Sequence, residues 1–165
     1  MAQQIENIAE KIQGSHLLTD IFGRWPSFHD AEVISMELCR NLTGIPHPTL
    51  KARIHVWEIT SEVNDRGYYV LRNHVLAGFL FRDIDELSMN GFNQQNALWG
   101  LEILDITSRQ LEFLQFEVHF ASSFGVEARF KCHSVQIETV EAYIPERNEG
   151  LPRQSGTRPG EPKHN

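Results

Sequence analysis

The sequence predicts an α+β domain that is mostly β, in which short N-terminal helices pack on a curved antiparallel sheet of about six to eight strands. Apolar residues recur at helical spacing before Gly23, and beyond it they alternate with a period of two. The alternating segments follow one another every ~10–15 residues, which is typical of hairpins and meanders rather than of crossover units. A chain of 165 residues, 41% of them hydrophobic, suffices for one such domain without a metal or a disulfide.

Two short helices are expected at the N-terminus. Isoleucine and alanine side chains at helical spacing predict an amphipathic helix over Gln3–Gln13, which Gly14 ends. Ser15 then stands where it can cap a second helix, which runs through Phe22 and ends at Gly23. We expect both helices to pack on one face of the sheet.

The alternation that follows predicts the first two strands. In Glu32–Arg40, the face that carries Ile34, Met36 and Leu38 is the more apolar one, and we expect it to face the core. Thr49–Ile59 alternates cleanly between apolar and polar side chains, which predicts a half-buried antiparallel strand with a polar outer face.

The third strong candidate, His74–Arg82, is apolar on both faces, which predicts a central strand buried on both sides. We expect Ile84–Met89 to continue it beyond a bulge near Asp83. Leu98–Ile106 is either a strand or a short helix, because its periodicity fits both. The other expected strands are Tyr68–Leu71, Leu111–Phe120, Val126–Cys132 and Val135–Tyr143, and a turn is expected at Asn64–Gly67.

One domain is expected over residues 1–145, followed by a disordered tail over residues 146–165. The tail is rich in proline, glycine and charge, so it cannot bury enough apolar surface to become ordered. The formal net charge of the chain is −7, which disfavours binding to nucleic acid because that role calls for a basic face. The charge suits a basic protein partner, although ordinary solubility explains it as well.

The sequence predicts a cytoplasmic protein that does not enter a membrane. Its first residues lack an apolar segment of secretory length, and no apolar run reaches the ~18 residues that a bilayer requires. The two cysteines, Cys39 and Cys132, are far apart and lie in strand-like segments, so we expect free thiols in a reducing compartment.

Residues 25–32 read Trp-Pro-Ser-Phe-His-Asp-Ala-Glu, and they admit two interpretations. In the first, His29, Asp30 and Glu32 bind a metal ion or act as acid and base, since these residue types suit zinc or a harder ion. The chain would then be a metal-binding protein or a small metal-dependent enzyme. Adjacent side chains diverge along an extended chain, however, and no second histidine pair supports this interpretation.

In the second interpretation, which we favour, the same segment is structural. Trp25 and Phe28 anchor the turn between helix and strand in the core, and Pro26 stiffens that turn. Asp30 or His29 then accepts hydrogen bonds from the amides of the loop, and Glu32 starts the first strand.

No catalytic pattern appears elsewhere. The sequence lacks a nucleophile elbow, a phosphate-binding loop, a dinucleotide fingerprint and a Cys-x-x-Cys pair, so we expect no enzyme activity, no catalytic residue, no metal and no cofactor. Aromatic side chains are enriched in interfaces and acidic ones suit a basic partner. The candidates for partner contact on these grounds are Trp57, Glu58, Glu62, Asp65, Tyr68, Tyr69 and Glu117. The three aromatic residues are equally well explained as cross-strand packing pairs.

The segment Trp25–Val33 resembles the W-P-x-F-H-D-A-E-like turn of the immunity protein 50 family of bacterial polymorphic-toxin systems. Weaker similarities lie in the strand Phe79–Phe81, the turn Asn90–Phe92 and the strand Gly125–Cys132, and the resemblance spans Ile21–Ile137. It implies a cytosolic protein that binds and blocks a cognate toxin domain, with no established catalytic residue or cofactor. It leaves open the identity of the toxin, the contact residues and the oligomeric state.

Overall fold

The computed structural model describes residues 7–41, 43–44 and 47–144. The expected tail, residues 146–165, lies outside this range, and so do the first residues of the expected helix Gln3–Gln13. The elements are η1 (Ile8–Lys11), α1 (His16–Phe22), β1 (Glu32–Cys39), β2 (Thr49–Val63), β3 (Tyr69–Arg82), β4 (Asp85–Asn90), β5 (Ala97–Asp105), η2 (Thr107–Arg109), β6 (Phe116–Phe124), β7 (Glu127–Cys132) and β8 (Ser134–Ala142).

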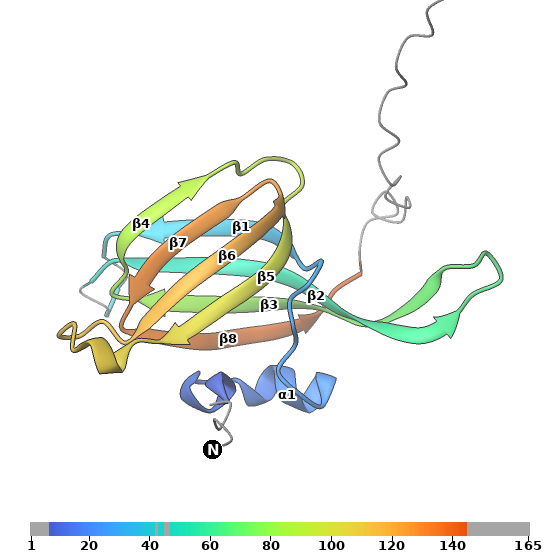
Figure 1. Ribbon diagram of the computed structural model, residues 1–165, viewed down its shortest axis with the longest axis horizontal. Coiled ribbons are helices and arrows are strands. Elements are labelled where there is room, and N and C mark those ends of the chain that lie inside the picture. The colour runs from blue at the N-terminus through green and yellow to red at the C-terminus, as the bar shows by residue number, and fades with distance from the viewer. Residues whose placement is uncertain (1–6, 42, 45–46, 145–165) are drawn as a thin grey trace, which may run out of the picture.

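The expected fold class is confirmed. The strands form one open antiparallel sheet of eight strands in the order β4-β7-β6-β5-β1-β2-β3-β8. β1 and β5, at the middle of this order, share the single register pair Glu32 and Ala97. The sheet is strongly curved there, so that β4, β7, β6 and β5 face β1, β2, β3 and β8 (Figure 1).

The core lies between these two groups of four strands. Phe81 of β3 meets Phe120 of β6 and Phe130 of β7, with ring centroids 6.0 and 5.0 Å apart. The alternation predicted the inward side chains of β2 correctly, since the apolar residues from Leu50 to Val56 are all buried. β3 is buried on both faces around Phe79–Phe81, which confirms its prediction as a central strand.

The N-terminal segment runs along the outer edge of β8. Gln13 accepts a hydrogen bond from the Ile137 amide and donates one to the Val135 carbonyl. α1 ends at Gly23 in the left-handed region, as expected, but the Ser15 side chain makes no capping hydrogen bond. Among the described residues of the first expected helix, Ile8–Lys11 form the short 3₁₀ helix η1.

Three local expectations were wrong. In β1, a register shift between Val33 and Ser35 brings Val33 onto the inward face as well, opposite Ile54. Met36 and Leu38 keep the expected inward face, opposite Ala52 and Leu50, although half of Leu38 is exposed. Asp83 adopts a positive φ, and the chain then crosses over the core, where β4 pairs with β7 rather than prolonging β3. The ladder predicted from Leu111 begins only at Phe116.

The placement of two strands depends on partners that are distant in the chain. Leu98–Ile106 forms strand β5, whose ladder to β6 includes the pair Leu101 and Phe120. β8 follows β7 directly in the chain but pairs with β3, which places the last strand at the far edge of the sheet.

Candidate partner-binding surface

A two-stranded ribbon projects from the body where β2 and β3 extend beyond the neighbouring strands β1 and β8 (Figure 1). β1 pairs with β2 as far as His55, and β8 pairs with β3 as far as Val75. Beyond these points β2 and β3 pair with each other, and neither has a second strand partner among the described residues. We call residues 57–73 the arm.

The tip of the arm is a well-defined turn. The Asn64 side-chain oxygen accepts hydrogen bonds from the amides of Arg66 and Tyr68, at 2.9 and 3.1 Å. Gly67 has a φ of +81°, a conformation that favours glycine. The expected turn at Asn64–Gly67 is therefore confirmed.

One face of the arm is apolar and exposed. Ile59 pairs with Leu71 and Val63 pairs with Tyr69, and directly paired residues project from the same face of a ladder. Tyr69 and Leu71 are two residues apart in one strand, so all four side chains share that face. Their exposed fractions are 53%, 43%, 58% and 63% for Ile59, Leu71, Val63 and Tyr69.

The opposite face is polar and internally paired. Glu58 stands opposite Arg72 in the ladder and accepts a hydrogen bond from the Asn73 side chain at 3.0 Å. The Arg72 guanidinium lies 2.6 Å from the Glu62 carboxylate. These contacts neutralise much of the charge on this face.

An aromatic and histidine cluster lies at the base of the arm. The His55 and His74 rings share a hydrogen bond of 3.0 Å, and the rings of Trp57 and Tyr143 lie 4.7 and 4.5 Å from that of His55. The pKa of His55 is lowered to about 4, first because burial disfavours the charged ring and second because His74 is close. His55 lies on the outward face that the alternation of β2 predicts to be polar, yet only 3% of it is exposed.

The structure brings most of the predicted contact residues together on the arm, although Trp57 is half-buried rather than exposed. Glu117 lies elsewhere, on β6, where Arg109 pairs with it at 2.6 Å. Those on the arm are Trp57, Glu58, Glu62, Asp65, Tyr68 and Tyr69.

Sequence reasoning missed Ile59, Val63 and Leu71. The signal was present, because the apolar positions of β2 are even-numbered from Leu50 to Val56 and odd-numbered from Trp57 onward.

The Trp25–Glu32 segment forms the turn that leads into β1. Trp25 and Phe28 pack on each other with ring centroids 5.5 Å apart, and both contact Phe79 of β3. Pro26, which lies between them in the sequence, is buried. Phe28 and Asp30 have positive φ values, which shape the turn.

Its polar side chains do not converge on one point. His29 Nδ1 lies 3.1 Å from Asp30 Oδ2, and the His29 ring packs on Trp99. Glu32 instead accepts a hydrogen bond from the Asn96 amide at 2.7 Å. Within the part of the chain that the structure describes, no three His, Cys, Asp or Glu side chains are grouped to hold a metal ion.

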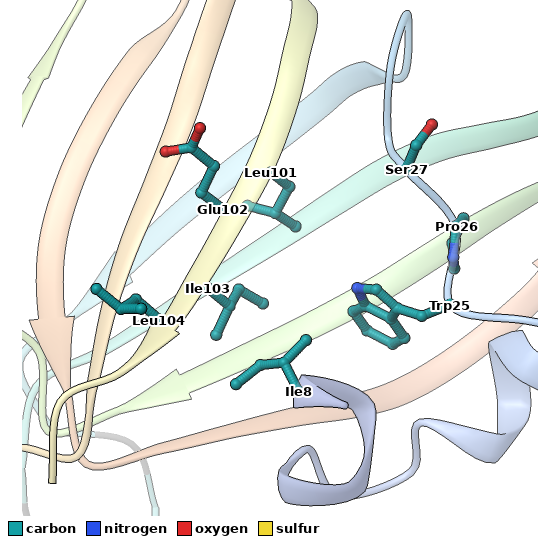
Figure 2. A pocket seen from close by; sticks show the side chains of 8 residues that line it. All are labelled: Ile8, Trp25, Pro26, Ser27, Leu101, Glu102, Ile103 and Leu104. Carbon is teal, nitrogen blue, oxygen red and sulfur yellow. The ribbon is translucent and has the colours of Figure 1, made fainter. Parts of the chain in front are cut away.

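An apolar groove of about 600 Å³ lies beside this turn (Figure 2). Figure 2 shows Trp25 and Ile8 on one side and Leu101 and Ile103 of β5 on the other. The groove provides apolar contacts and one carboxylate. Its lining residues are Ile8, Trp25, Pro26, Ser27, Leu101, Glu102, Ile103 and Leu104.

We expect Trp25→Ala to lower the free energy of unfolding by about 3 kcal/mol, because it removes a ring packed on two core phenylalanines. Trp99→Ala is the matched control, since 66% of Trp99 is exposed. It should change stability by less than about 0.5 kcal/mol. Denaturant unfolding measures both, and equal effects would show that Trp25 does not anchor the turn.

The model of the family described as Immunity protein 50 matches residues 14–143. The chain belongs to this family. The match includes the Trp25–Glu32 turn, all eight strands and the whole arm, and it extends the resemblance seen in the sequence at both ends. No curated protein and no solved structure matches the chain. None of the described helices of this Immunity protein 50 member is long and apolar enough to cross a membrane.

Proposed function

We propose that this protein neutralises a cognate toxin domain by binding it in the cytoplasm, without catalysis, and that the arm is the contact surface. Membership in the Immunity protein 50 family carries the proposal. A tight complex needs no cofactor and no reactive group in the immunity protein, because blocking a toxin requires only that its working surface be covered.

The arm supports the proposal because it projects from the body (Figure 1) and exposes apolar side chains. Isolated two-stranded ribbons are at best marginally stable in water, so a projecting ribbon gains from a partner that covers it. The net charge of −7 favours encounter with a basic toxin.

Co-expression in a bacterial host tests this function. The toxin domain encoded beside this protein should stop growth when expressed alone, and growth should return when this protein is expressed with it. Glu117→Gln is a suitable control, because Glu117 lies on β6 away from the arm and the variant should protect as well as the wild type. Equal killing with and without this protein would refute the proposal.

A further inference from the structure

The polarity of the ribbon reverses where it leaves the body. Within the body, the inward side chains of β2 are apolar up to Val56, and the outward ones include Arg53 and His55. Along β2, the period of two places Trp57 and Ile59 on the outward face and Glu58 on the inward one. β3 follows this arrangement because it has one extra residue where the ladder shifts register, between the pair Val56 and Val75 and the pair Glu58 and Arg72. The arm is therefore apolar on its outer face and polar on the face that prolongs the core side.

This reversal means that the apolar side chains of the arm do not extend the core of this protein. The side chains Ile59, Val63, Tyr69 and Leu71 form what we call the apolar stripe, and it begins beside the half-buried Trp57 at the base. Exposed contiguous apolar side chains bordered by polar ones are typical of a protein interaction site.

We infer that the apolar stripe, rather than the acidic side chains of the arm, is the surface that binds the toxin domain. The inference rests on the proposed function and deepens it. Glu62 is already paired with Arg72, and Glu58 with Asn73, so a partner would have to break these contacts to use them. Interface energy is concentrated in a few side chains that become fully covered, with tyrosine prominent among them, and the stripe provides one in Tyr69.

The charge of the molecule indicates the kind of partner. The chain carries a net charge of −7, and Asp65 lies on the arm two residues after Val63. The toxin domain that fits this surface presents an apolar patch bordered by lysine or arginine side chains. The charges then speed encounter and orient the two proteins, while the stripe supplies the affinity.

The test compares two double variants of the full chain that change opposite faces of the same ribbon. Ile59→Ser with Tyr69→Ser removes half of the stripe, and Glu62→Gln with Arg72→Gln removes the ion pair of the polar face. Calorimetry measures binding to the toxin domain encoded beside this protein. The toxin domain is used in a form inactivated by substitution of its catalytic residue. Circular dichroism and thermal melting check folding, and Tyr69→Arg serves as a single substitution at an exposed position if the double variant misfolds.

We expect the stripe variants to weaken binding by at least roughly 100-fold, as loss of central interface side chains does. The polar-face variant should stay within roughly threefold of the wild type, as is usual for exposed ion pairs. If the stripe variants bind like the wild type, the inference is wrong while the proposed function stands. If the wild type itself does not bind, the proposed function fails and the inference fails with it.

Light scattering of the protein alone tests whether the stripe binds a second copy of this chain instead of the toxin domain. We expect a monomer. A dimer that the stripe substitutions dissociate, with unchanged affinity for the toxin domain, would overturn the assignment of this face to the toxin.

Discussion

Replacing Phe81 by alanine is expected to lower the free energy of unfolding by about 4 kcal/mol. Phe81 is fully buried and meets Phe79, Phe120 and Phe130, so its ring joins the two groups of strands that face each other. Its removal leaves a cavity that the sheet can close only in part. Because typical domains are stable by only 5–15 kcal/mol, the variant should be close to unfolding.

Denaturant titration measures this loss, and Phe113→Ala is the matched control. Phe113 is half exposed in the turn before β6, so its truncation should cost less than about 0.5 kcal/mol. A loss below about 1 kcal/mol for Phe81→Ala would mean that the two groups of strands are not joined through this ring.

The second large effect is a loss of stability in acid that depends on His55. Its pKa is about 4 in the folded protein and about 6.5 in the unfolded chain. Between these values the unfolded chain binds more protons, so stability falls as the pH falls from 6.5 to 4 and is fully present above 6.5. The full difference corresponds to less than about 4 kcal/mol.

Unfolding titrations between pH 4 and pH 7.5 measure this dependence for the wild type and for His55→Asn. The variant should be less stable at neutral pH, because the ring packs on Trp57 and Tyr143, but its stability should fall less with acid. His16→Gln, at an exposed position, should keep the slope of the wild type. If His55→Asn also keeps that slope, proton binding at His55 does not govern stability in acid.

The features that the sequence predicted well are those that depend on neighbours along the chain. The alternation from Leu50 to Val56 locates the buried face of β2, and the composition of Asn64–Gly67 locates the turn at the tip of the arm. The helix end at Gly23 follows in the same way, because a left-handed residue there suits glycine.

The features that it missed depend on partners that are distant in the chain. Nothing near Ser134–Ala142 indicates that this strand pairs with β3 across the sheet rather than with β7. The shift in β1 after Val33 is a property of its ladder with β2 and could not be read from apolar spacing.

The candidate site shows the same division. Sequence reasoning selected acidic and aromatic side chains one at a time, and this choice located the arm but not its face. Only the register that sets Ile59 opposite Leu71 and Val63 opposite Tyr69 reveals an apolar stripe. The contacts on the opposite face show that Glu62 forms an ion pair with Arg72.

Hydrogen–deuterium exchange of this protein, with and without the toxin domain encoded beside it, tests the central proposal most directly. We predict that amides of residues 57–73 exchange more slowly in the complex, while the amides of β6 around Glu117 exchange as before. Slower exchange confined to β6, or no change anywhere on the arm, would contradict the account.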